Sequence, residues 1–82
     1  MRFKKIEQWI IRNIPLGKNI KFIRKSKHLT QKDVTTKLQL MGSYMSEDTL
    51  SNIETGRRNI KANDLKALKI IFDVDYEEFF KE

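Results

Sequence analysis

The sequence of 82 residues contains no cysteine and a single histidine, His28. Without cysteine, neither a disulfide framework nor a cysteine-based zinc site is possible, and one histidine alone does not build a metal centre. No apolar run approaches the ~20 residues that a membrane span requires. The N-terminus is basic and then apolar, but Glu7 and Arg12 interrupt it and no small-residue cleavage site follows. We therefore expect a cytoplasmic protein with no metal, no cofactor and no membrane partner.

Groupings of residues that carry catalysis are also absent. The sequence has no glycine-rich loop of the kind that cradles phosphates, and no paired carboxylates placed for acid–base chemistry. A chain of 82 residues forms one domain with a modest core. Such a domain offers little room for a substrate pocket. We therefore do not expect an enzyme.

The charge balance is basic, with 17 lysines and arginines against 11 acidic residues and a formal net charge of +6. A positive domain suits a polyanionic partner such as nucleic acid. Many small domains are basic for solubility alone, so charge by itself leaves both interpretations open.

Apolar residues recur at helical spacing along the chain, and no segment alternates as a strand does. The pattern predicts an all-α protein, a compact bundle of five to six short helices. Helices this short are marginal alone, so a shared core must hold them together. The core positions predicted from the periodicity are Leu16, Ile20, Ile23, Val34, Leu38, Leu50, Ile53, Leu65, Leu68, Ile71 and Phe72.

Residues 1–15 are predicted to form an N-terminal amphipathic helix that extends the main domain at residues 16–82. Phe3, Ile6 and Ile10 lie on one face of this helix. The face has three interpretations. It packs as an extra core helix on Phe22, which lies off the inward stripe of the next helix, it dimerises with its copy, or it lies on a membrane as a basic amphipathic segment.

Residues typical of helix ends divide the main domain. Side chains that cap helix N-termini precede the predicted helices at Thr30, Ser46, and Asn59 or Asn63, and Asp73 or Asp75 starts a short last turn. Asp33, three residues after Thr30, completes a capping box. Glu47 and Asp48 follow Ser46 in the first turn, where the helix dipole favours acids. Gly56 stands where a helix stops.

These signals form a spaced constellation of Arg24, then Leu29-Thr30-Gln31, then a segment from Ser46 to Gly56. Gln31 stands seven positions after Arg24, and Gly56 stands ten positions after Ser46. On these residues the chain resembles the phage-repressor family of helix-turn-helix proteins, called XRE or Cro-like, over roughly residues 16–80. The resemblance implies a lambda-repressor-like domain in which the second helix of the motif, the recognition helix, enters a DNA groove.

The resemblance also implies roles for single positions. Arg24 and Glu54 match a pair that usually forms a salt bridge, which fixes orientation more than it adds stability. The positions that usually face base edges are Glu47, Asp48, Thr49 and Asn52. The expected phosphate contacts are Gln31, Arg57 and Arg58 from the resemblance, with Lys32, Ser46 and Lys61 added for their charge or hydroxyl group.

Two features depart from the family pattern. The connection from Gln39 to Met45 is longer than the usual turn by roughly five residues, and its Leu40, Met41 and Tyr44 are expected either in the core or on an exposed contact surface. The paired acids at the start of the recognition helix repel phosphates. A carboxylate also accepts a hydrogen bond from cytosine N4, so base contact and ordinary dipole chemistry are both open.

The sequence therefore predicts a transcriptional regulator that binds double-stranded DNA sequence-specifically. In this prediction it is a repressor that acts as a homodimer on a palindromic operator, as family members commonly do. The alternative is a protein-interaction module on the same fold, of the antitoxin or anti-repressor type, with a regulatory protein as its partner.

Overall fold

The computed structural model describes residues 15–82. These residues contain four α-helices and a final 3-10 helix, with no strand among them: α2 (Leu16–Ser26), α3 (Gln31–Leu40), α4 (Glu47–Glu54), α5 (Ala62–Phe72) and η1 (Tyr76–Phe80). The all-α prediction is confirmed. The described part holds four α-helices rather than five to six, since the last segment forms only a 3-10 turn. The helix predicted at the N-terminus lies outside the described residues.

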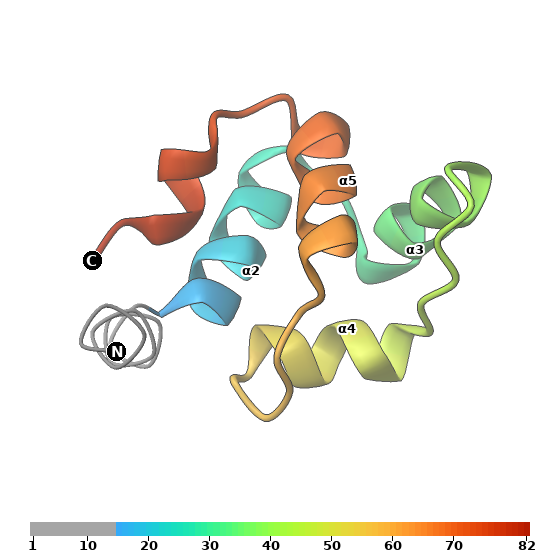
Figure 1. The fold of residues 1–82 in the computed structure, drawn as a ribbon, viewed down its shortest axis with the longest axis horizontal. Coiled ribbons are helices and arrows are strands. Elements are labelled where there is room, and N and C mark those ends of the chain that lie inside the picture. The colour runs from blue at the N-terminus through green and yellow to red at the C-terminus, as the bar shows by residue number, and fades with distance from the viewer. Residues whose placement is uncertain (1–14) are drawn as a thin grey trace, which may run out of the picture.

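The helices form two groups that share α4 as a base (Figure 1). Helix α2 packs against α4 and η1, and α3 packs against α4 and α5. The chain end is fixed to α2 by Asn19, whose Nδ2 donates to the backbone oxygens of Phe79 at 2.8 Å and Lys81 at 2.7 Å. The start of α2 and the C-terminal turn therefore lie side by side.

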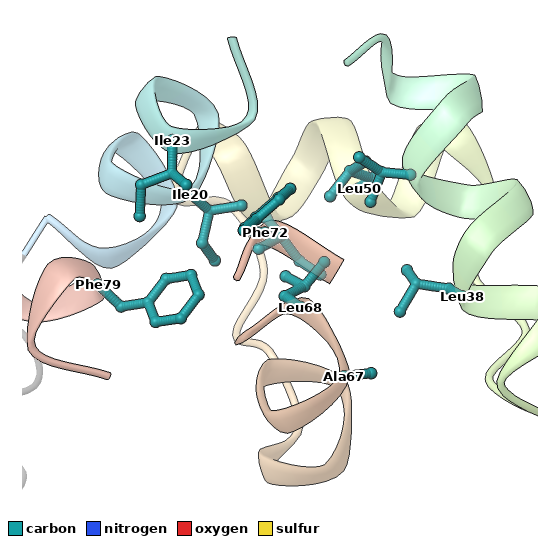
Figure 2. Packing of buried hydrophobic residues seen from close by; sticks show 10 residues of the cluster. Ile20, Ile23, Leu38, Leu50, Ala67, Leu68, Phe72 and Phe79 are labelled. Carbon is teal, nitrogen blue, oxygen red and sulfur yellow. The ribbon is translucent and has the colours of Figure 1, made fainter. Parts of the chain in front are cut away.

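One apolar core joins all five elements (Figure 2). Phe72 of α5 and Phe79 of η1 are fully buried, with ring centroids 6.3 Å apart. Most predicted core positions are buried, while Leu16, Leu65 and Ile71 are partly buried residues packed against the core. The core members are Ile20, Ile23, Val34, Leu38, Leu50, Ile53, Ala67, Leu68, Phe72 and Phe79. Phe22 remains 74% exposed.

Helix starts follow the predicted chemistry in two cases and differ in a third. The Thr30 hydroxyl accepts from the Asp33 N–H at 3.0 Å, and the Thr30 N–H donates to the Asp33 carboxylate at 2.8 Å. Ser46 caps α4. The prediction that Asn59 or Asn63 caps α5 is wrong, because the N-cap is Lys61 and it makes no side-chain cap. The half-buried Ile60, immediately before this N-cap, packs on the core.

All four α-helices end with a residue in the left-handed conformation: His28, Gly42, Gly56 and Asp73. In each case the next residue donates its N–H back to a carbonyl five positions earlier, as Arg57 does to Asn52 at 2.9 Å. This is the Schellman ending, which satisfies carbonyls that would otherwise lack partners. Gly56, with a φ of 81°, stops the recognition helix as predicted.

Helices α2 and α4 approach each other closely at Gly17. A Cβ atom at this position would lie 1.9 Å from the Ile53 carbonyl oxygen, well inside van der Waals contact. Only a residue without a side chain allows this approach. The contact places the end of α4 directly against the first turn of α2.

Candidate nucleic-acid interface

A buried ion pair fixes the end of α4 against α2. Arg24 Nε donates to Glu54 Oε2 at 2.7 Å, and Arg24 Nη2 donates to Glu54 Oε1 at 3.2 Å. The third guanidinium nitrogen, Nη1, donates to the Leu29 carbonyl oxygen at 2.8 Å. The two side chains are 8% and 1% exposed. The salt bridge implied by the family resemblance is therefore present, and its bidentate geometry sets both the position and the rotation of α4.

Gln31 joins this pair from the first position of α3. Its Nε2 donates to Glu54 Oε1 at 3.0 Å, so Glu54 holds α2 and α3 at once. The half-buried side chain was expected at a DNA phosphate. An amide nitrogen carries two protons, and the bond to Glu54 uses one of them. The sequence pattern did not indicate this contact, because Gln31 and Glu54 are 23 positions apart.

The outward face of α4 is polar. Glu47 and Asp48 are exposed, while Thr49, Ser51 and Asn52 are half-buried. The opposite face carries Leu50, Ile53 and Glu54, which are buried. Ser51 was missed in the sequence analysis, although its spacing of three from Asp48 places it on the same outward face.

The Ser46 hydroxyl is used in capping α4. It accepts from the Thr49 N–H at 3.1 Å and lies 3.0 Å from the Thr49 hydroxyl. Both side chains are therefore held at the helix start. Their roles toward DNA remain predictions.

Three of the cations expected at phosphates lie on the connection that follows α4. Arg57 and Arg58 both donate their backbone N–H to the Asn52 carbonyl oxygen, at 2.9 and 3.2 Å. Their side chains are exposed, as is that of Lys61 at the start of α5. Lys32 is exposed in the first turn of α3. The Schellman ending thus holds the backbone of both arginines directly beside Asn52.

The charges on α4 and its flanks are segregated by sign. Glu47 and Asp48 occupy its first turn, where the helix dipole favours them. Arg57 and Arg58 follow its last turn. The two ends of the recognition helix therefore offer opposite charges to an approaching ligand.

The connection between α3 and α4 is shorter than predicted. Helix α3 continues to Leu40 before Gly42 ends it, so residues 41–46 link the two helices. The Ser43 hydroxyl donates to the Asp64 carboxylate of α5. Met45 packs on the core. Leu40, Met41 and Tyr44 are 84%, 44% and 82% exposed, which decides between the two expectations for them in favour of the surface.

Together, the short α3, its connection and the anchored α4 constitute a helix-turn-helix of the DNA-binding class. The chain matches the helix-turn-helix family over residues 20–79, which is most of its length. It belongs to this family, in the XRE-type branch of DNA-binding transcription regulators. No curated protein and no solved structure shows significant similarity to the chain.

No helix within residues 15–82 has the length and apolar character needed to cross a membrane. The same residues contain no group of three or more side chains arranged to hold a metal ion.

Proposed function

We propose that the protein is a sequence-specific repressor that binds a palindromic operator as a homodimer in the cytoplasm. The observation that supports this most directly is the arrangement around Asn52. Its side chain lies on the polar face of α4, and its carbonyl oxygen holds the backbone of Arg57 and Arg58. A group suited to base edges thus stands beside two groups suited to phosphates.

In this proposal affinity comes mainly from cations that meet phosphates and release counterions. The contacts at the end of α4 are Arg57, Arg58 and Lys61. At the start of α3 they are Lys32 and the second amide proton of Gln31, helped by the partial positive charge of the helix N-terminus. Ser46 adds a hydroxyl at the start of α4.

Specificity comes from the outward face of α4. The Asn52 amide is suited to pair with both edge groups of adenine, and Thr49 to contact a thymine methyl. The carboxylates of Glu47 and Asp48 accept from cytosine N4 in the major groove. Ser51, on the same face, joins the proposed contacts. Each true base contact is worth about 1–3 kcal/mol of discrimination.

Dimerisation follows from the small size of the surface. One helix of eight residues contacts only a few base pairs, so a single copy binds weakly. Two copies related by a two-fold axis contact two half-sites, which is why a palindrome is proposed. A domain that occupies an operator excludes other proteins from the same DNA, which supports repression.

The test is selection from a pool of random duplexes at physiological salt, followed by sequencing. An enriched palindrome supports a dimeric operator-binding regulator, and its half-site spacing reports the dimer geometry. Weak, salt-sensitive binding without enrichment rejects the proposal. That outcome favours a protein partner, for which the acidic first turn of α4 is the surface to examine.

Two variants with a matched control test the assigned roles. Asn52→Ala is expected to relax specificity, so that binding to the selected site falls toward that of random DNA. Arg57→Ala is expected to weaken all sequences alike and to lower the slope of affinity against salt by about one unit. Lys25→Ala removes the same charge from the exposed face of α2 and is expected to change neither the specificity nor the salt slope. Equal losses on selected and random DNA for Asn52→Ala would remove it from the base contacts.

A further inference from the structure

Tyr44 lies in a linker that is anchored on both sides of it. Ser43 donates its hydroxyl to Asp64 of α5, and Met45 packs on the core. Ser46 then caps α4. Tyr44, between these anchors, is 82% exposed. The linker is thus tied down while its largest side chain is left in solvent.

The anchors determine which way Tyr44 projects. Burial alternates along residues 43–46, with Ser43 and Met45 half-buried and Tyr44 and Ser46 exposed. In an extended chain, alternate residues face opposite sides, and Ser46 itself has extended backbone angles. Tyr44 therefore shares its side with Ser46, next to the N-terminal end of α4.

The linker and the first turn of α4 carry no cation of their own. Residues 41–49 contain no lysine or arginine but include Glu47 and Asp48. The cations Arg57, Arg58 and Lys61 follow the other end of the helix, on the connection to α5. Figure 1 shows the two connections at opposite ends of α4. Within the linker and the first turn of α4, a phosphate contact therefore comes from a neutral donor.

The spacing of the two ends suits a DNA groove. A helix of eight residues is about 12 Å long, and the major groove is about 12 Å wide. Groups just beyond the two ends of α4 thus fall over different phosphates. The phenol of Tyr44 has an O–H donor on a rigid ring with few rotatable bonds. Fixing it at a phosphate therefore costs little conformational entropy.

We propose that Tyr44 donates its phenolic hydroxyl to a DNA backbone phosphate beside the N-terminal end of α4. The proposal rests on the DNA-binding function proposed above. It extends the interface from the two helices of the motif to the linker between them. The contact balances the arginines at the other end of the helix, and it positions the acidic first turn without placing a cation next to it.

The test compares Tyr44→Phe with the wild-type chain on the selected operator and on random duplexes, across a series of salt concentrations. The substitution keeps the ring and removes only the donor, and an 82% exposed side chain is not needed for folding. We expect affinity to fall about tenfold on both kinds of DNA, as for loss of a hydrogen bond to a charged group. The salt slope is expected to stay unchanged, because a neutral donor releases no counterion.

Leu40→Ala is the matched control, since Leu40 is equally exposed near the same linker but has no hydrogen-bonding side chain. It is expected to leave DNA binding unchanged. A second measurement replaces single phosphates by neutral methylphosphonates. One replacement is expected to weaken the wild-type chain and to have no further effect on Tyr44→Phe.

The outcomes separate this proposal from the previous one. If the wild-type chain binds no duplex, the DNA-binding function fails, and this proposal fails with it. If Arg57→Ala weakens binding and Tyr44→Phe does not, only the Tyr44 contact is overturned. A loss confined to the selected operator would indicate a base contact and would also overturn it. Equal losses for Leu40→Ala and Tyr44→Phe would overturn it in favour of an apolar surface.

Discussion

Substitution of Glu54 by alanine is expected to destabilise the domain severely. Glu54 accepts from Arg24 at 2.7 and 3.2 Å and from Gln31 at 3.0 Å. Without it, the buried guanidinium of Arg24 keeps only the Leu29 carbonyl as a partner. Removing one partner of a buried pair costs about 3–5 kcal/mol. A domain of 82 residues has a total stability of about 4–12 kcal/mol, so this loss is between about a quarter and the whole of the total.

The measurement is urea unfolding followed by far-ultraviolet circular dichroism, with the midpoint and the m-value both determined. Gln31→Ala is the comparison variant, with a smaller expected loss of stability than Glu54→Ala. It removes one neutral donor and leaves the bidentate pair intact, so we expect a loss of about 1 kcal/mol. The double variant Arg24→Met, Glu54→Leu replaces both charges by apolar groups and is expected to regain most of the stability, because no charge is left buried.

The reasoning is refuted if Glu54→Ala lowers the free energy of unfolding by less than about 1 kcal/mol with an unchanged m-value. That result would mean that Arg24 reaches solvent when its partner is removed. The pair would then behave as a surface salt bridge. A double variant no more stable than Glu54→Ala would equally refute the explanation by an uncompensated charge.

Three further stability predictions follow from the packing and the helix ends. Phe79→Ala is expected to lower the free energy of unfolding by about 3–5 kcal/mol, measured by thermal or urea unfolding. Phe80→Ala, at a residue that is 39% exposed, is expected to lower it much less. Similar losses for both variants would contradict the assigned burial. Gly17→Ala is expected to cost about 1–3 kcal/mol, because its Cβ must displace the Ile53 carbonyl, and a neutral result would show that α2 and α4 separate easily. Hydrogen bonds from the backbone and hydroxyl of Thr30 lower the pKa of Asp33 in the folded chain. The stability that this carboxylate contributes is therefore present at neutral pH and is lost as pH falls through the lowered pKa, below about 4. Asp33→Asn is expected to flatten that acid-side dependence in pH-dependent unfolding, and an unchanged profile would exclude the capping box as its source.

Local chemistry was enough to predict many of the helix ends. The Thr30 and Asp33 capping box needs residues three apart, and the Ser46 cap and the Gly56 stop are equally local. The apolar periodicity identified most of the buried core, because each helix buries one stripe. The Arg24–Glu54 pair is different. It was inferred from the family resemblance, not from any local pattern.

What escaped sequence analysis depends on tertiary contacts. Helix α5 has Lys61 as its N-cap without a side-chain cap, directly after Ile60, which packs on a core formed by other helices. The Gln31–Glu54 bond joins residues that no periodicity relates. The exposure of Tyr44 depends on Ser43 reaching Asp64 in another helix. The end of α3 at Leu40, in contrast, was available from Gly42, which stands two residues beyond it.

The placement of Glu54 has a consequence for how such a protein changes over time. The residue that orients α4 is on its buried side, and the residues proposed to contact bases are on its outward side. Exposed substitutions usually change stability by no more than about 0.5 kcal/mol. The exposed positions 47 and 48 are therefore free to vary without loosening the fold. A lineage that carries this chain is able to acquire new target sites by exchanging a few outward side chains while one carboxylate keeps the helix in its place.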